Sequence, residues 1–306
     1  MTLQQLTYIV AVHEYRHFGQ AAQACKVTQS TLSSMIQKLE AEMDVLIFDR
    51  KKQPIEPTRL GAKLIDQAKV ILYHTSQFEE LVQLERDQDQ GEIRLGIATT
   101  VAPYILPSLF KKMSENAPKV NLEVSELRSI QLTHKLLRAE LDMAIMPSPE
   151  NQKELLEIPL YQERYYAYVA PSHPLFSHAS ISPQEFADDK MWLLKGGHCL
   201  RGESDERVEP SLMAAYEEGS VDTLIRIVDA NGGYTFIPEL HISLLKRCQK
   251  RNVRPLHHPE QVRQISLVVR NDFVKERLLN KVVDQLKTII PPTLINPRLQ
   301  KFKVKL

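Results

Sequence analysis

The chain has 306 residues, of which 43% are hydrophobic and 25% charged, and its formal net charge is +1. This length predicts two or three domains, and the composition is typical of a soluble globular protein. No apolar run approaches the roughly 20 residues of a membrane span and the N-terminus is polar, so we expect a cytoplasmic protein without a spanning helix, a signal peptide or a membrane partner.

The first 27 residues predict two helices and a turn. Thr2 and Gln5 have the spacing of a capping box, and an apolar stripe from Leu3 onward carries the first helix to about Tyr15. A short alanine-rich helix follows at 20–24, and residues 26–27 form the turn before the next helix. This order is that of a helix-turn-helix unit.

The next helix, predicted at 28–39, has an unusual outer face. Its apolar residues recur at steps of three and four, at Leu32, Met35, Ile36, Leu39 and then Met43. The opposite face carries short polar side chains, which can approach a polyanion and present hydrogen-bonding groups to base edges. With Thr28 as the N-cap, the candidate DNA-binding residues of this helix are Thr28, Gln29, Ser30, Thr31, Ser33, Ser34 and Gln37.

A basic wing is expected after this helix. Residues 45–48 favour a strand, and Pro54 and Pro57 exclude a helix there, so residues 45–57 predict a strand-loop-strand unit. Arg50, Lys51 and Lys52 lie in its loop. Three cations in a loop are by default solvated surface, but directly after a helix-turn-helix we expect them to contact DNA phosphates.

A long helix is predicted from about residue 58 to a hinge before Gly91. Its apolar residues are spaced like a coiled-coil seam, and at about 1.5 Å per residue the helix would reach about 40 Å, too far for a domain of about 60 residues to cover. We therefore expect a partner chain on this seam, and packing on the chain's own C-terminal domain is the alternative. The candidate dimerisation residues are Leu64, Ala68, Ile71, Phe78 and Val82.

Beyond Gly91 strands alternate with helices. Strands are predicted at 93–97, 120–124, 143–146, 165–170, 191–194, 233–237 and 265–269, and helices at 104–116, 130–138 and 274–290. This rhythm predicts a parallel-sheet α/β organisation with two lobes and a ligand cleft between them. The resulting fold class is a multidomain α+β protein, with domains at 1–58, 59–90 and 91–306; the last has lobe 1 at about 91–161 and 266–306 and lobe 2 at about 162–265.

Two stretches of this last domain have the chemistry of a binding site. Thr99 and Thr100 join a strand to a helix N-terminus, which favours a small polar or anionic ligand, although plain N-capping explains them too; Ser129 invites the same two interpretations. In the second stretch, two glycines precede Cys199, and His198 and Arg201 have the charge to stabilise a thiolate there. Such a thiolate would be oxidised first to a sulfenic acid.

The remaining motifs argue against a metal site or a cofactor. His13 and His17 flank the H-E-x-x-H pattern of zinc proteases, but the first helix ends between them and no third ligand has a suitable spacing, so we interpret the pattern as chance. The other cysteines, Cys25 and Cys248, are expected to be packed residues. Three cysteines without zinc spacing also argue against a disulfide framework.

The whole chain resembles the LysR-type transcriptional regulators. The likeness rests on Phe18-Gly19-Gln20-Ala21-Ala22, the helix at 28–39 with Glu40, Phe48-Asp49-Arg50, Thr58 with Gly61, and His173-Pro174-Leu175. It implies an N-terminal winged helix-turn-helix, a dimerising linker helix and a two-lobed effector domain like the periplasmic binding proteins. The implied partners are double-stranded promoter DNA, further copies of the chain in a homodimer or homotetramer, and RNA polymerase.

Within the family, residues 197–201 and 100–107 resemble those of the peroxide-sensing members. That likeness implies a peroxidatic role for Cys199 and a peroxide-holding hydroxyl at Thr100, with support from His198, Arg201 and Ser129. This chain departs from the pattern at Val208, since neither Val208 nor its neighbours supply the resolving cysteine. Sulfenic acid formation remains open to Cys199, but the usual intramolecular disulfide does not.

The sequence therefore predicts a DNA-binding regulator that responds to hydrogen peroxide through Cys199. One alternative is a regulator of the same family that binds a metabolite or anion in the cleft, with Cys199 silent. A second, from another class, is an enzyme, either a thiol peroxidase at Cys199 or a zinc hydrolase at His13 and His17; the missing resolving thiol argues against turnover.

Overall fold

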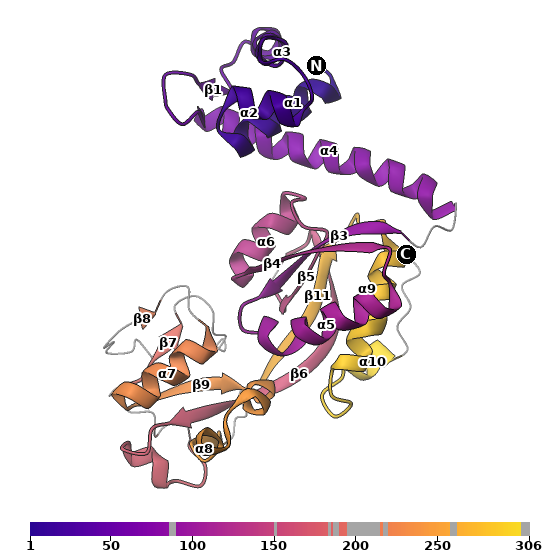
Figure 1. Ribbon diagram of the computed structural model, residues 1–306. Helices are drawn as coiled ribbons and strands as arrows, with labels where there is room; N and C mark the ends of the chain where they lie inside the picture. The colour runs from indigo at the N-terminus through magenta and orange to yellow at the C-terminus, as the bar shows by residue number, and fades with distance from the viewer. Residues whose placement is uncertain are drawn as a thin grey trace. The chain divides into compact units, whose positions relative to one another are not determined.

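The computed structural model describes residues 1–85, 90–149, 152–182, 185, 190–194, 215–216, 220–257 and 262–300. The chain divides into two compact units, with the boundary near residue 88 (Figure 1). The first unit contains α1 (Leu3–Tyr15), α2 (Phe18–Ala24), α3 (Gln29–Met43), β1 (Phe48–Asp49), β2 (Glu56–Pro57) and α4 (Arg59–Glu85). Within the described ranges, no helix is long and apolar enough to cross a membrane.

The first two helices begin at side-chain caps. The predicted capping box is present on α1, where Gln5 N–H donates to Thr2 Oγ1 at 3.3 Å and Thr2 N–H donates to Gln5 Oε1 at 2.9 Å. The second helix begins two residues earlier than predicted. Its N-cap is His17, whose Nδ1 accepts from the amides of Gly19 and Gln20 at 3.1 and 3.3 Å. An imidazole cap before an alanine-rich run is a weak sequence signal, because Ser, Thr, Asp and Asn are the usual caps.

The apolar face of α3 packs into the core of this unit, together with side chains of α1. Leu32, Ile36 and Leu39 are almost completely buried, as predicted, and Met35 is partly buried. Met43, expected on the same stripe, is 39% exposed. The helix ends there, and Asp44 follows with a left-handed φ of 51°, so the stripe stops one turn before Met43.

The wing has shorter strands than predicted. Instead of a strand over 45–48, Phe48 and Asp49 pair with Pro57 and Glu56 in a two-residue antiparallel ladder. The reason lies in the buried carboxylate of Glu40, whose Oε1 accepts from the amides of Ile47 and Phe48 at 2.8 and 3.3 Å. Because α3 binds these amides, the residues before Phe48 run along its end and do not extend the ladder.

The start of α4 is held closely against the wing. Thr58 donates from its amide to the carbonyl of Ile47 at 2.9 Å and from Oγ1 to that of Leu46 at 2.7 Å. A Cβ at Gly61 would lie 1.9 Å from the Ile47 carbonyl oxygen, so only glycine allows this approach.

The second unit is built on a mixed sheet. Its first part contains β3 (Gly91–Ala98), α5 (Ala102–Asn116), β4 (Val120–Leu127), α6 (Ser129–Leu137), β5 (Met143–Pro147) and β6 (Leu155–Val169). The rest contains the 3-10 helix η1 (Pro174–Ser177), β7 (Leu193–Leu194), β8 (Ala215–Tyr216), α7 (Val221–Asn231), β9 (Tyr234–Pro238), the 3-10 helix η3 (Glu239–Leu244), α8 (Arg247–Lys250), β10 (Val253–Pro255), β11 (Val262–Arg270), α9 (Glu276–Ile289) and α10 (Pro297–Gln300).

The expectation of a parallel sheet is only partly correct. Strand β3 pairs in parallel with β4 and β5, but β11 is antiparallel to both β5 and β6, and β6 is antiparallel to β9 and β10. Strand β6, of 15 residues, follows β5 without an intervening helix, so no crossover sets it parallel to its neighbours. The two-residue strands β7 and β8 pair in parallel with each other, apart from this sheet.

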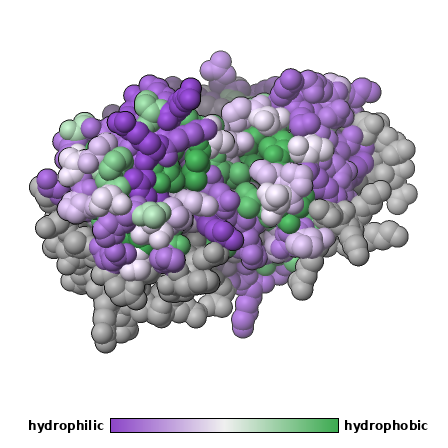
Figure 2. Space-filling view, turned by 90° about the horizontal axis from the view of Figure 1, so that it is seen from below, coloured by the Kyte–Doolittle hydropathy of each residue, from purple (hydrophilic) through white to green (hydrophobic). Residues whose placement is uncertain are grey.

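The strand β6 serves both ends of this sheet. Its first ten residues pair with β11 except Leu160, where the register shifts, and its last residues, from Tyr165 onward, pair with β9. Helices α5 and α9 lie side by side along the sheet (Figure 1), joined by a hydrogen bond of 2.8 Å from Asn116 Nδ2 to Gln285 Oε1. Seen from below, hydrophobic side chains reach the surface in separate patches between hydrophilic ones (Figure 2).

Candidate functional site

The outer face of α3 presents the polar residues that the sequence predicts for DNA binding. Thr28 caps the helix through Oγ1, which accepts from the amide of Thr31 at 3.2 Å. Its hydroxyl also shares hydrogen bonds with those of Ser30 and Thr31, at 3.0 and 2.8 Å. Of the predicted residues, Ser33 is half-buried. The others are exposed, namely Thr28, Gln29, Ser30, Thr31, Ser34 and Gln37. The face is therefore open to a ligand along its length.

The three cations of the wing differ in their surroundings. Arg50 is turned toward the protein, because its Nη2 donates to Glu40 Oε2 at 3.1 Å and its guanidinium lies 5.3 Å from the ring centroid of Phe18. Lys52 forms an ion pair with Glu56 at 2.6 Å. Lys51 is exposed, and its ammonium has no acceptor among the described residues. The predicted phosphate contact is thus best supported for Lys51, while Arg50 joins the wing to α3.

The predicted dimerisation residues of α4 fall into two groups. Ala68 is 1% exposed and Leu64 is partly buried, and both pack into the core of their own unit. Covering Ala68 therefore needs no partner chain, contrary to our expectation. Ile71 and Phe78 are exposed, by 38% and 71%, and the side chain of Val82 lies outside the described part of the structure.

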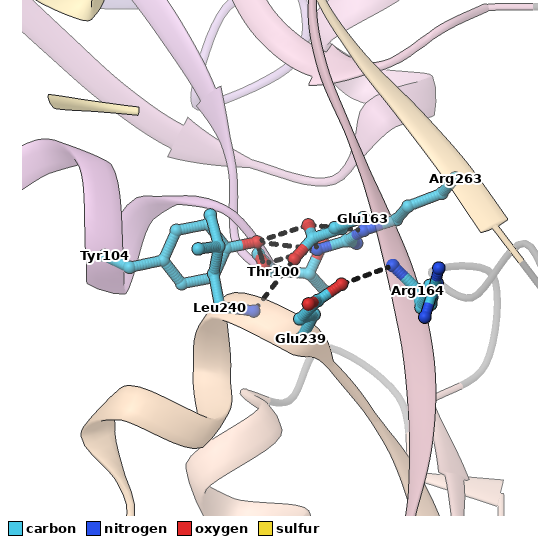
Figure 3. A network of polar contacts seen from close by, with 7 residues as sticks. All are labelled: Thr100, Tyr104, Glu163, Arg164, Glu239, Leu240 and Arg263. Carbon is cyan, nitrogen blue, oxygen red and sulfur yellow. Dashed lines mark hydrogen bonds and ion pairs between the residues drawn. The ribbon is translucent and has the colours of Figure 1, made fainter. Parts of the chain in front are cut away.

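In the second unit, Thr100 lies in a buried polar network (Figure 3). It is only 4% exposed, in the loop between β3 and α5. Its Oγ1 accepts from Nη1 of Arg263 on β11 at 2.9 Å, and its carbonyl oxygen accepts from Arg263 Nη2 at 3.1 Å. Capping is not its role, since α5 has Val101 as N-cap and no side-chain cap.

The centre of this network is the carboxylate of Glu163 on β6. Its Oε1 accepts from Arg263 Nε and Nη2 at 3.0 and 2.8 Å, and its Oε2 accepts from the amide of Leu240 on η3 at 3.1 Å. The side chains of Glu163 and Arg263 are 0% and 2% exposed. One carboxylate thus connects two strands of the sheet and η3, as Figure 3 shows.

Tyr104 on α5 completes the network. Its hydroxyl accepts from Arg263 Nη2 at 2.6 Å, and the Thr100 carbonyl and Glu163 Oε1 lie within its own donating reach at 2.7 and 3.1 Å. Burial raises the pKa of Tyr104 far above its usual value, so the phenol stays neutral and keeps its proton for these acceptors.

Ser129 reaches the same edge of the sheet as Thr100. The strands β3 and β4 pair in parallel up to Ala98 and Leu127, and the amide of Thr99 donates to the Leu127 carbonyl at 3.2 Å. Thr100 and Ser129 follow the ends of these two strands, as a ligand site at strand C-termini requires. Ser129 is half-buried.

The predicted residues Cys199, His198 and Arg201, like Val208, lie outside the described residues.

The other two cysteines differ from each other. Cys25 packs partly against the core at the end of α2, and burial raises the pKa of its thiol, which lowers its reactivity. Cys248 on α8 is exposed, so the expectation that it is packed was wrong. The described residues contain no group of three or more His, Cys, Asp or Glu side chains that could hold a metal ion.

No sequence pattern singles out Glu163, Arg263 or Tyr104 as site residues. Glu163 and Arg263 are 100 residues apart in the chain, and their strands also carry other charged residues, such as Glu157 and Arg270. Glu163 and Arg263 lie just before the predicted strands 165–170 and 265–269, so the predicted elements gave no sign that their side chains are buried.

Comparison with known proteins agrees with this architecture. Residues 3–62 match the family model of the bacterial regulatory helix-turn-helix proteins of the lysR family, and residues 86–289 match the LysR substrate binding domain. The chain is 30% identical to a hydrogen peroxide-inducible genes activator of Haemophilus influenzae, over 95% of this chain and 99% of that protein.

Two further relatives are OxyR proteins. The DNA-binding transcriptional dual regulator OxyR of Escherichia coli is 30% identical, over 88% of this chain and 90% of its own. The solved structure of a full-length OxyR variant from Pseudomonas aeruginosa is 30% identical and superimposes with a TM-score of 0.79, covering 97% of this chain and 98% of its own. The chain therefore belongs to the LysR family of bacterial helix-turn-helix regulators, and it is homologous to OxyR over nearly its whole length.

Proposed function

We propose that this protein is a DNA-binding transcriptional activator that responds to hydrogen peroxide by oxidation of Cys199. The observation that carries the proposal is the similarity along nearly the whole chain to hydrogen peroxide-inducible genes activators, at 30% identity. The exposed polar face of α3 supports the DNA-binding part, because its side chains are free to meet base edges.

The DNA-binding unit would act as one of a symmetric pair. Helix α3 would lie in the major groove, with Lys51 beside the backbone, and two copies would contact half-sites about one helical turn apart or a multiple of it. The exposed Phe78 and Ile71 of α4 are the side chains we assign to the contact between copies. A homodimer or homotetramer in the bacterial cytoplasm, working on RNA polymerase at the promoter, is the assembly that this role requires.

The sensing reaction would take place at the Cys199 sulfur. Its thiolate attacks one oxygen of hydrogen peroxide, the O–O bond breaks, and hydroxide leaves and is protonated to water. The sulfur becomes a sulfenic acid. Without a cysteine at Val208, this acid persists, forms a mixed disulfide with a small thiol, or forms a disulfide with Cys248, in that order of preference. A hydroxyl at Thr100 and a polar group at Ser129 fit the role of holding the peroxide, with His198 and Arg201 as support for the thiolate.

Oxidation would act on DNA through a change in subunit arrangement. A modified Cys199 loses its local packing and hydrogen bonds, the following segment rearranges, and the spacing of the two DNA-binding units changes. The protein is then a reporter of oxidant and not a catalyst, in line with relatives that are transcription regulators.

Mass spectrometry of the purified protein after stoichiometric peroxide tests this proposal. We expect an added oxygen on Cys199, blocked by C199S, while the matched variant C248S oxidises like the wild type. A DNA footprint that changes with peroxide in the wild type and not in C199S completes the expectation. An unmodified Cys199 under conditions that oxidise a control thiol would refute it, and an unchanged response in C199S would favour a metabolite effector near Thr99, Thr100 and Ser129.

A further inference from the structure

The hydroxyl of Thr100 has a fixed hydrogen-bond direction. A guanidinium has five N–H donors and no acceptor, so in the 2.9 Å contact with Arg263 Nη1 the Thr100 oxygen must accept. The hydroxyl hydrogen then remains to be donated elsewhere. None of the described residues accepts this hydrogen, although Thr100 is buried, with only 4% of its surface exposed. A buried donor without an acceptor is costly, so this atom is suited to a ligand that accepts a hydrogen bond.

The positive charge beside this hydroxyl is cancelled inside the protein. Glu163 Oε1 takes two of the Arg263 donors, at 3.0 and 2.8 Å, and both side chains are excluded from solvent. The ion pair carries no net charge, so the attraction of Arg263 for an anion is offset by the Glu163 carboxylate. An anion at Thr100 would therefore gain less from Arg263 than it would without Glu163.

We infer that Glu163 determines the class of ligand that binds at Thr100. Because Glu163 neutralises Arg263, the Thr100 hydroxyl donates to a small neutral hydrogen-bond acceptor, and anions are excluded. The inference rests on the proposed function, because hydrogen peroxide is a ligand of the admitted class. It also counts against an anionic effector at Thr99 and Thr100, which the sequence alone left open. Glu163 acts through Arg263 and Thr100, and it is a positioning residue.

Glu163→Gln tests this inference, because glutamine keeps the shape and removes the charge. The probe is inorganic sulfate, titrated calorimetrically into the full-length protein at constant ionic strength in sodium chloride. We expect no Thr100-dependent sulfate binding by the wild type, and binding by E163Q at least about tenfold tighter, a change of about 1.4 kcal/mol. The signal should disappear in the double variant E163Q/T100V, which separates this site from any sulfate bound at the N-terminus of α3.

Two control variants separate this charge effect from a general one. Glu239→Gln removes a carboxylate from the same region, where Glu239 Oε2 accepts from the Arg164 amide at 3.2 Å and does not touch Arg263 (Figure 3). It should behave like the wild type. Glu163→Asp keeps the charge and should restore the exclusion of sulfate.

The outcomes are distinct. A folded E163Q that gains no sulfate affinity overturns the inference, and so does sulfate binding by the wild type that T100V abolishes. Should E163Q fail to fold, the wild-type titration still decides between these results, since Thr100-dependent binding contradicts the inference and its absence supports it. Peroxide oxidation of Cys199 is scored separately in the wild type. Its absence would contradict the proposed function and leave the sulfate result standing.

Discussion

Arg50 of the wing donates from Nη2 to Oε2 of Glu40 on α3 across 3.1 Å, while Oε1 of the same carboxylate accepts two wing amides. Glu40 is 6% exposed, so one buried carboxylate fixes the wing relative to α3. The positive charge of Arg50 offsets the free-energy cost of burying the Glu40 carboxylate.

Glu40→Gln should therefore destabilise the first unit by about 1.5–3 kcal/mol, because the ion pair with Arg50 is lost and the amides of Ile47 and Phe48 then donate to a neutral oxygen. Urea unfolding followed by circular dichroism would measure this. The exposed Glu14→Gln is the control and should change the free energy of unfolding by less than about 0.5 kcal/mol. Equal effects in the two variants would contradict the role of Glu40.

Gln29→Ala should weaken specific DNA binding by about 1–3 kcal/mol and leave nonspecific binding unchanged, because an exposed amide on α3 can form two hydrogen bonds with a base edge. Gel shifts on promoter and random DNA would separate the two quantities. Gln67 is exposed on α4, and Gln67→Ala is expected to bind both DNAs like the wild type. An equal loss on both DNAs would place Gln29 at the backbone instead.

Lys51→Ala should weaken binding to all sequences alike and lower the slope of log affinity against log salt by about 0.9, the value for one phosphate contact. Lys52→Ala is the neighbouring comparison. Its ammonium is already paired with Glu56 at 2.6 Å, so its effect should be smaller. Identical slopes in wild type and K51A would show that Lys51 does not contact a DNA phosphate.

Phe78→Glu should shift the protein toward monomers, because it places a charge on a side chain that is 71% exposed on α4 and that we assign to the subunit contact. Sedimentation velocity over a range of concentrations would show the change, and DNA affinity should fall with it. The exposed Gln67→Glu is the control on the same helix. A Phe78→Glu protein with wild-type assembly would locate the interface elsewhere.

The stability of the second unit should fall in acid through Asp142. Burial alone would raise the pKa of this carboxyl, but hydrogen bonds from Arg94 at 2.8–3.2 Å and the charge of Lys275 at 3.3 Å lower it overall. Because the folded pKa lies below the unfolded value of about 3.9, the stabilisation is complete above that value and is lost as the pH falls through the folded pKa.

The free-energy difference between wild type and Asp142→Asn should thus shrink steadily as the pH falls below about 4. Chemical unfolding at a series of pH values measures it. The exposed Asp284→Asn serves as the reference, and its difference from the wild type should stay small throughout. A difference that stays constant for Asp142→Asn would show that its ion pairs do not set the acid stability.

The sequence predicted the elements whose causes are local. Thr2 with Gln5 and Thr28 with Thr31 are caps within one helical turn, and the strand-helix alternation placed β3, α5, β4 and α6 within a few residues. Contacts between distant segments were not predictable in this way. Glu40 decides the length of the wing strand, although nothing near residue 47 indicates it.

In the candidate sites, too, the locally determined features were predictable and the contacts between distant segments were not. The exposed face of α3 follows from helical periodicity alone, and Thr100 and Ser129 follow from the ends of two strands. The ion pair between Glu163 and Arg263 depends on β6 and β11 lying next to each other, which no local pattern specifies. That pairing, more than any single motif, fixes what Thr100 can bind.

The close fit of Gly61 against the Ile47 carbonyl makes α4 and the wing one rigid body at this joint. Helix α4 has 27 residues, so it forms a lever of about 40 Å. A tilt of about 5° at one end of such a lever moves the other by about 3.5 Å, close to the 3.4 Å rise between successive nucleotides of a strand. A rotation of α4 by this small angle would therefore shift α3 by about one base pair, without any change within the helix-turn-helix and wing.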